Sequence, residues 1–127
     1  MITREELKHV LQQAEGLRAV VIGDVMLDKY VYGSVDRISP EAPVPIVTLH
    51  HTDVKAGGAA NVAANLAAWG CKTSLIGLVG DDDHAREMTS LLDQLKIEHG
   101  WITDNTRPTT VKTRVVASSH HLLRIDE

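Results

Sequence analysis

The sequence predicts an α/β fold in which a parallel sheet is flanked by helices and joined to a smaller β layer. Two short aliphatic runs, RAVVIGD at 18–24 and TSLIGLVG at 73–80, alternate along the chain with helical patterns. Strand–helix alternation of this kind is typical of a parallel sheet with right-handed crossovers. The chain has no Phe, so Val, Leu, Ile and Ala must build the core, as is common in sheets covered on both faces.

Three helices are expected from capping signals and apolar periodicity. Thr3 and Glu6 have capping-box spacing ahead of a helical repeat that ends at Gly16. The alanine-rich segment 57–69 is apolar around its axis, which predicts burial on most sides. A third helix is expected over about 83–95, and the acidic run DDD directly before it is interpreted as N-capping and dipole compensation.

Two further segments have a β-rich pattern outside the strand–helix alternation. Residues 29–51 contain three prolines, and prolines are confined to strand edges, bulges and turns. They are therefore expected to form a hairpin-like excursion. Residues 109–125 are β-rich again, with a turn expected at Ser118 and Ser119, and a short strand is expected near 98–102.

Composition narrows the class of protein. A chain of 127 residues fits one domain with a modest core. The net charge of −4 and the lack of a basic cluster argue against a nucleic acid or an anionic membrane as partner. Residues 1–16 lack the apolar core of a secretory leader, and a single cysteine, Cys71, suits a reducing cytoplasm. The adjacent His pairs place their rings on opposite strand faces, so no metal site is expected.

The first candidate site residues are Asp24 and Asp28, after the first predicted strand. Ligands of open α/β sheets bind at the carboxyl ends of the strands. Two carboxylates suit a polyol, whose hydroxyl groups donate hydrogen bonds. The spacing is equally consistent with one turn aspartate and one surface aspartate.

The second candidate is the start of the alanine-rich helix. Gly57 and Gly58 directly precede it, so its free backbone N–H groups and positive dipole end can face a ligand. Asn61 follows within one turn and can both donate and accept. The string matches neither G-x-G-x-x-G nor the Walker pattern. For the alanines a close helix–sheet contact is the better interpretation, whereas for the two glycines and Asn61 ligand contact is favoured.

The third candidate is cationic. Lys112 and Arg114 are two residues apart, so on a strand they share one face. Joined by Arg124 across a hairpin, they can hold a phosphate. An exposed, solvated strand face explains the same charges equally well.

Taken together, these residues resemble the ribokinase-like, or phosphofructokinase-B type, carbohydrate kinases. The order of strands, helices and β segments agrees over essentially the whole chain, and the resemblance is sharpest at VVIGDVMLDKYVYG, GGAANVAANLAAWG and TTVKTRVVASSHHLLRID. The string RISPEAPVPIV is the most discriminating. It resembles the heptose 7-phosphate kinase / heptose 1-phosphate adenylyltransferase branch of the family.

The resemblance implies a sugar-phosphate site made of eight residues of this chain: Asp24, Asp28, Gly57, Gly58, Asn61, Lys112, Arg114 and Arg124. In that interpretation the aspartates accept hydrogen bonds from sugar hydroxyls and the glycines and the asparagine pack against the sugar. The three cations lie near its phosphate. Segments 29–51 and 109–125 become a β lid that closes over the substrate and forms a homodimer contact.

The resemblance also implies a reaction, ATP-dependent phosphorylation of the anomeric hydroxyl of a heptose 7-phosphate with magnesium, on the way to ADP-heptose and lipopolysaccharide. The family string D-T-x-G-A-G-D, which supplies the catalytic base and anion hole, does not occur in the 127 residues. Residues 1–127 are therefore expected to be the N-terminal substrate-binding portion of an incomplete fold, inactive alone. The alternatives are a fragment of another ribokinase-like sugar kinase and a non-catalytic sugar-binding or dimerisation module.

Overall fold

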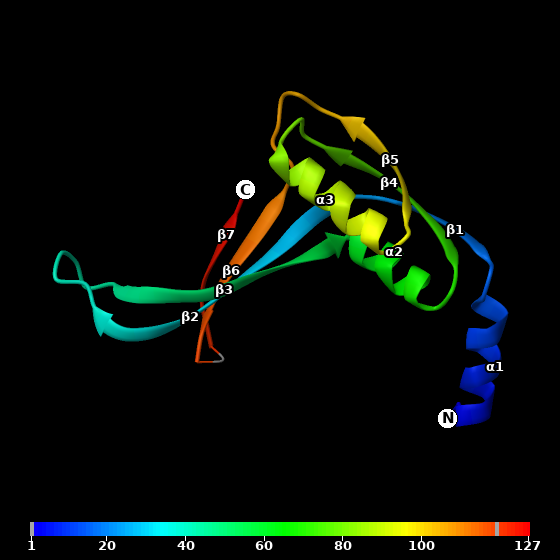
Figure 1. Cartoon of the computed structure of the whole chain (residues 1–127), viewed down its shortest axis with the longest axis horizontal. Helices are drawn as coiled ribbons and strands as arrows, with labels where there is room; N and C mark the ends of the chain where they lie inside the picture. Colours follow the sequence, from blue (N-terminus) through cyan, green and yellow to red (C-terminus); the bar gives the residue numbers. More distant parts are fainter. Residues whose placement is uncertain (1, 119) are drawn as a thin grey trace.

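Two β-sheets organise the chain in the computed structural model, which describes residues 2–118 and 120–127 (Figure 1). The helices and strands follow one another as α1 (Arg4–Ala14), β1 (Arg18–Ile22), β2 (Val25–Ile38), β3 (Pro45–Gly58), α2 (Ala59–Ala68), β4 (Lys72–Val79), α3 (Asp83–Gln94), β5 (Glu98–Thr103), β6 (Val111–Ala117) and β7 (His120–Asp126). The predicted α/β fold with a parallel sheet and helices is thus confirmed. Ser119, one of the two expected turn residues, lies outside the described residues.

The parallel sheet has the order β1-β4-β5, with β4 in the centre. Every second residue of β4 from Thr73 to Val79 is buried, because this face lies against α2 and shares a core with Met88 and Leu92 of α3. The core here combines Leu75 of β4 with Ala63 of α2 and Met88 of α3, each completely buried. Small alanine side chains therefore let α2 approach the sheet closely.

The second sheet has the order β3-β2-β6-β7. β2 and β3 form a long antiparallel hairpin whose tip projects away from the helices (Figure 1). β6 runs parallel to β2, and β7 returns antiparallel beside β6. Segments 29–51 and 109–125 therefore lie in one β layer, as expected, but the hairpin is longer than predicted because β2 and β3 extend back to Val25 and forward to Gly58.

Two burial predictions are wrong. In α2 only Ala60 and Ala63 are buried, and Val62 is 50% exposed, because the helix packs on the sheets along one side. In β1, Val20 and Ile22 are 63% and 75% exposed. The helices cover only the other face of this strand, so half of its aliphatic side chains have no cover among the described residues.

Helix α1 begins with the predicted capping box. Thr3 N–H donates to the Glu6 carboxylate at 2.7 Å, and Glu6 N–H donates to the Thr3 hydroxyl at 3.2 Å. Gly16 follows the helix with φ +77°, the left-handed conformation that suits glycine. None of the residues of α1 is buried. Neither this helix nor the other two described helices is long and apolar enough to cross a bilayer.

Asp82 caps α3 and also ties the following loop to the helix. Its carboxylate accepts hydrogen bonds from Ala85 N–H at 2.9 Å and from Thr109 N–H at 2.7 Å. Desolvation by itself raises the pKa of Asp82, but the bonds from Thr109 and Ala85 outweigh it and hold the pKa below its ordinary value. The capping interpretation of the acidic run is therefore confirmed at Asp82, which also positions the approach to β6.

We expect Asp82→Ala to lower the free energy of unfolding by about 1–2 kcal/mol at pH 7, since an N-cap and a loop contact are both lost. The pKa of Asp82 is lower in the native state than in the unfolded chain, where it is about 3.9. The stabilisation that Asp82 provides is therefore present above about pH 3.9 and is lost as the pH falls through the native pKa. Urea unfolding at pH 7 and at pH 3 measures both effects.

The control is Asp81→Ala, which removes a carboxylate of the same loop that lies 3.9 Å from Arg86 and is 77% exposed. We expect this change to cost less than about 0.5 kcal/mol. Equal losses in the two variants at pH 7 would contradict the capping role of Asp82.

Candidate functional site

One face of the four-stranded sheet is polar and the other is mainly apolar. Side chains directly opposite one another on neighbouring strands project from the same face. Asp28 of β2 is opposite Lys55 of β3 and Lys112 of β6, so these three charged residues form a row across the sheet. The alternate positions Leu27 and Val111 are completely buried in the core. The alternation of β2 thus points one set of side chains inward and presents a charged set outward.

Asp28 and Arg114 form an ion pair at the centre of this polar face. Arg114 Nη1 donates to Asp28 Oδ1, although the two residues are 86 positions apart in the sequence. The side chains are 21% and 20% exposed, and the hydrogen bond with Asp28 raises the pKa of the Arg114 guanidinium. Asp28 was expected in the loop after the first strand. It instead lies inside β2, because that strand begins again at Val25.

Gly57 is required beside the Asp28 carboxylate. It is buried in β3, and a Cβ placed on it would lie 2.5 Å from Asp28 Oδ2 and 2.8 Å from Met26 Cγ. No side chain can occupy this space without moving Asp28. The glycine therefore lets the Asp28 carboxylate and the Met26 side chain lie directly against the backbone of β3.

Gly58 turns the chain from β3 into α2. Its φ of +58° is the left-handed conformation that favours glycine. The Ala59 N–H then donates to the Asp24 carbonyl oxygen at 2.8 Å, so this N–H at the start of α2 is not free for a ligand as the sequence suggested. The side chains of Asp24 and Asn61 are exposed beside the junction. The structure therefore brings the Asp24 backbone, Gly58 and Asn61 to one end of the sheet.

The three predicted phosphate-binding cations have different surroundings. Arg114 is held by Asp28, and Arg124 is opposite Arg114 on β7 but pairs with Asp126 of its own strand, with 2.8 Å between Nε and Oδ1. Among the described residues, Lys112 has no carboxylate within 4 Å. The structure thus joins Lys112 and Arg114 to the site around Asp28 and leaves the guanidinium of Arg124 in a local pair.

Two residues of the polar face were missed by the sequence analysis, Tyr30 and Lys55. The Lys55 ammonium and the Arg114 guanidinium each lie 5.3 Å from the centre of the Tyr30 ring. Tyr30 follows Asp28 by two residues, so strand periodicity is a signal that could have found it. Lys55 carries no comparable signal, because its place depends on the register of β3 against β2.

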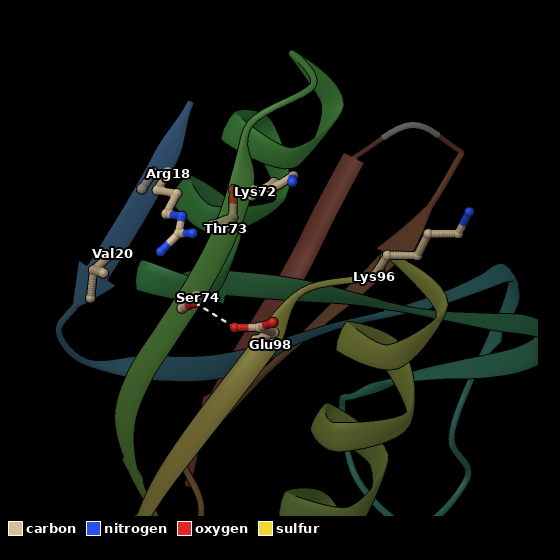
Figure 2. Close-up of a pocket in the computed structure, with 8 residues that line it drawn as sticks. Arg18, Val20, Lys72, Thr73, Ser74, Lys96 and Glu98 are labelled. Atoms are coloured by element: carbon tan, nitrogen blue, oxygen red, sulfur yellow. Dashed lines mark hydrogen bonds between the residues drawn. The ribbon is translucent and has the colours of Figure 1, made fainter. Parts of the chain in front are cut away.

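A cavity of about 580 Å³ lies elsewhere, at the amino ends of the parallel strands (Figure 2). Figure 2 shows the Lys72 and Lys96 ammonium groups pointing away from Arg18, so these cations do not converge. Glu98 accepts a hydrogen bond from the Ser74 hydroxyl at 3.0 Å, so the carboxylate that lines the cavity already has a partner. The cavity therefore contains none of the predicted site residues and no convergent set of ligating groups among its lining residues.

Within residues 2–118 and 120–127, no three His, Cys, Asp or Glu side chains gather closely enough to hold a metal ion. The Asp28 carboxylate, the central acidic group of the polar face, already binds Arg114. The donor set described here does not fit a magnesium site.

Comparison with known sequences identifies related proteins. The family model described as pfkB family carbohydrate kinase matches residues 17–126. The bifunctional protein HldE of Hyphomonas neptunium is 52% identical over 121 residues, which are 94% of this chain and 25% of that protein. HldE of Caulobacter vibrioides is 45% identical over 123 residues, 96% of this chain and 26% of that protein. The chain thus spans about a quarter of the length of these curated relatives.

Solved structures with the same fold are more distant in sequence. A carbohydrate kinase from Agrobacterium tumefaciens has a TM-score of 0.68 at 18% identity, covering 87% of this chain and 35% of that one. A ribokinase from Thermotoga maritima has a TM-score of 0.62 at 22% identity, covering 87% and 36%. These likenesses show a ribokinase-like fold of which this chain covers a part. With its family model matched over most of its length, the chain belongs to the pfkB family of carbohydrate kinases.

Proposed function

We propose that this chain is the sugar-recognition and lid portion of an ATP-dependent heptose 7-phosphate kinase. The observation that carries the proposal is the Asp28 carboxylate, fixed by Arg114 and lying against the bare backbone of Gly57. A carboxylate held in a fixed orientation suits the vicinal hydroxyls of a sugar. The choice of a heptose 7-phosphate is supported by the string RISPEAPVPIV, which resembles the kinases for that substrate.

In the proposed complex, Asp28 accepts hydrogen bonds from two sugar hydroxyls and Arg114 keeps its carboxylate oriented. Asp24 and Asn61 contact the sugar from the start of α2, where both side chains are exposed. The hairpin β2–β3 and the pair β6–β7 serve as the lid. Its closure excludes water, so that the phosphoryl group passes to the anomeric hydroxyl and not to solvent.

The proposed reaction also requires ATP and Mg²⁺, and the part of the chain that the structure describes gathers no set of side chains to hold the metal. Among the described residues, the Asp28 carboxylate is paired with Arg114, and Asp24 belongs to no group of three donor side chains that could hold a metal ion. We assign to this chain the binding and orientation of the sugar. Phosphoryl transfer depends on positioning and charge stabilisation around the transferred group, which we assign to segments that carry the D-T-x-G-A-G-D string.

We expect the 127-residue chain alone to transfer no phosphate from ATP to heptose 7-phosphate, because it has no D-T-x-G-A-G-D string to supply the base and anion hole. The measurement is ³¹P NMR of a mixture with ATP and Mg²⁺. A full-length family kinase added to the same mixture is the positive control. Turnover that purifies with the chain and disappears in the Asp28→Asn variant would overturn the assignment of roles.

Within a longer polypeptide that carries both this chain and the D-T-x-G-A-G-D string, we expect Asp28→Asn to lower kcat/KM for the sugar about 10–100-fold. The estimate follows from the loss of charge-assisted hydrogen bonds, about 1.5–3 kcal/mol. The KM for ATP should change less than about twofold on this assignment. Asp82→Asn, which alters a helix cap, is the control, and we expect it to leave sugar use unchanged. Equal effects of the two substitutions on the sugar would place the site elsewhere.

We also propose that the lid forms a homodimer contact. All residues of β7 are exposed. The side chains of Leu123 and Ile125 project from the other face of the strand than Arg124, and they are 50% and 49% exposed. An exposed edge strand with aliphatic side chains invites pairing with another copy. We expect light scattering to give a dimer for the natural chain and a monomer for Leu123→Lys/Ile125→Lys.

The control for the dimer experiment is Val10→Lys, which charges a side chain of α1 that is 51% exposed and lies outside the lid. This variant should remain dimeric. A natural chain that stays monomeric at high concentration would refute the dimer. A dimer that survives the double substitution would show that its interface is not on β7.

A further inference from the structure

The row of charges across the polar face alternates in sign from β3 to β7: Lys55, Asp28, Lys112 and Asp126. Asp28 stands between Lys55 and Lys112 in the register of the sheet, and its carboxylate also binds Arg114. Three cations therefore surround one carboxylate. Asp53 lies on the same face, but one step closer to the hairpin tip, opposite Tyr30. With Arg124 and Asp126 of β7 included, four cations and three carboxylates share this part of the face. The positive excess is therefore one charge, which favours an anionic ligand.

The three cations differ in what they can offer to such a ligand. Arg114 is engaged by Asp28, whereas Lys55 and Lys112 have no carboxylate within 4 Å among the residues that the structure describes. A lysine ammonium has three donors and no acceptor, so each of these two can bind a phosphate oxygen as a point charge. The free donors of the row are thus the two lysines on either side of Asp28.

Tyr30 restricts where the Lys55 ammonium can lie. The ammonium is 5.3 Å from the centre of the Tyr30 ring, and the Arg114 guanidinium approaches the same ring from the opposite neighbouring strand at 5.3 Å. The Tyr30 ring itself is stacked on Tyr32, with 6.1 Å between centres, and Tyr32 is stacked on His51 at 4.7 Å. A cation over an aromatic face is attracted to it. The stacked rings therefore hold Lys55 over the polar face, although its side chain is exposed.

We propose that Lys55, positioned by Tyr30, binds the phosphate group of the sugar phosphate together with Lys112. Arg114 is in this assignment a positioning residue for Asp28 and not a phosphate ligand. The inference rests on the proposed function for the presence of a phosphorylated sugar. Lys55 is opposite Asp28 in the register of β2 and β3, so a sugar that contacts the Asp28 carboxylate can place its phosphate beside Lys55.

The test is an NMR titration of the ¹⁵N-labelled 127-residue chain with heptose 7-phosphate, with the unphosphorylated heptose and with fructose 6-phosphate. We expect Lys55→Gln to weaken heptose 7-phosphate binding about tenfold and to leave the affinity for unphosphorylated heptose unchanged. The matched control is Lys29→Gln, which removes the same charge from the opposite face of β2 and should not change either affinity. Dispersed amide signals in each variant verify the fold.

Tyr30 is tested by a pair of substitutions. Tyr30→Leu should weaken heptose 7-phosphate binding about threefold, because the ring that attracts the Lys55 ammonium is lost. Tyr30→Phe keeps the ring and should restore the natural affinity. If Leu and Phe behave alike, Tyr30 does not position Lys55 through its ring.

The outcomes separate this inference from the proposed function. If the natural chain binds heptose 7-phosphate and Lys55→Gln behaves like Lys29→Gln, the Lys55 assignment is wrong and the proposed function stands. If fructose 6-phosphate binds in a Lys55-dependent way and heptose 7-phosphate does not bind, the phosphate site stands and the heptose assignment is wrong. If none of the three compounds shifts any signal, both proposals are wrong.

Discussion

The close backbone contact between the two sheets is the constraint on which the rest of the structure depends. The chain leaves the parallel sheet at Gly23 and enters the four-stranded sheet at Val25, within two residues. Where the two sheets meet, a Cβ on Gly77 would lie 2.6 Å from Val25 Cγ1, and a Cβ on Gly23 would lie 3.2 Å from the Ala59 Cβ. Side chains must be missing here for β2, β4 and α2 to pack together. The glycines thus fix where the polar face stands relative to the helix.

The short connection from the parallel sheet to the four-stranded sheet explains why the site residues gather at one end of the four-stranded sheet. Asp24 is part of the connection itself, and Asp28 follows it on β2 with one intervening outward-facing residue, Met26. β3 returns along β2 and brings Gly57 and Gly58 back to the same end, opposite Met26 and Val25. One hairpin therefore accounts for residues that are about 30 positions apart in the sequence.

The sequence predicted the local signals and the joining of segments 29–51 and 109–125 in one β layer, but not which residues pair across the strands. The cap at Asp82 and the box of Thr3 and Glu6 depend on neighbours within three residues, which the sequence displays directly. The pair of Asp28 with Arg114 depends on the parallel alignment of β2 with β6, for which a single sequence holds no signal. Arg124, by contrast, pairs with Asp126 only two residues away, and this local pair removes Arg124 from the cluster of cations that the spacing predicted.

The exposed aliphatic side chains of β1 show a second limit of sequence reasoning. Runs such as RAVVI predict a strand covered on both faces, but the pattern does not say which residues provide the cover. α2 packs against Val21, whereas Val20 and Ile22 face away from it. Burial depends on the arrangement of whole elements, so it cannot be read from one strand.

The magnitude of the Asp28–Arg114 interaction indicates that its role is orientation and not stability. Both side chains keep about a fifth of their surface in contact with solvent, which screens the attraction, and ion pairs in such settings contribute about 1 kcal/mol or less. A contribution of that size is small beside the burial of Leu27 and Val111 on the reverse face, each worth about 1.5–3 kcal/mol. The fold would therefore tolerate an apolar pair at these positions. A carboxylate held at one angle over Gly57 is instead a feature that matters for recognising a ligand, because it fixes the direction in which its free lone pairs point.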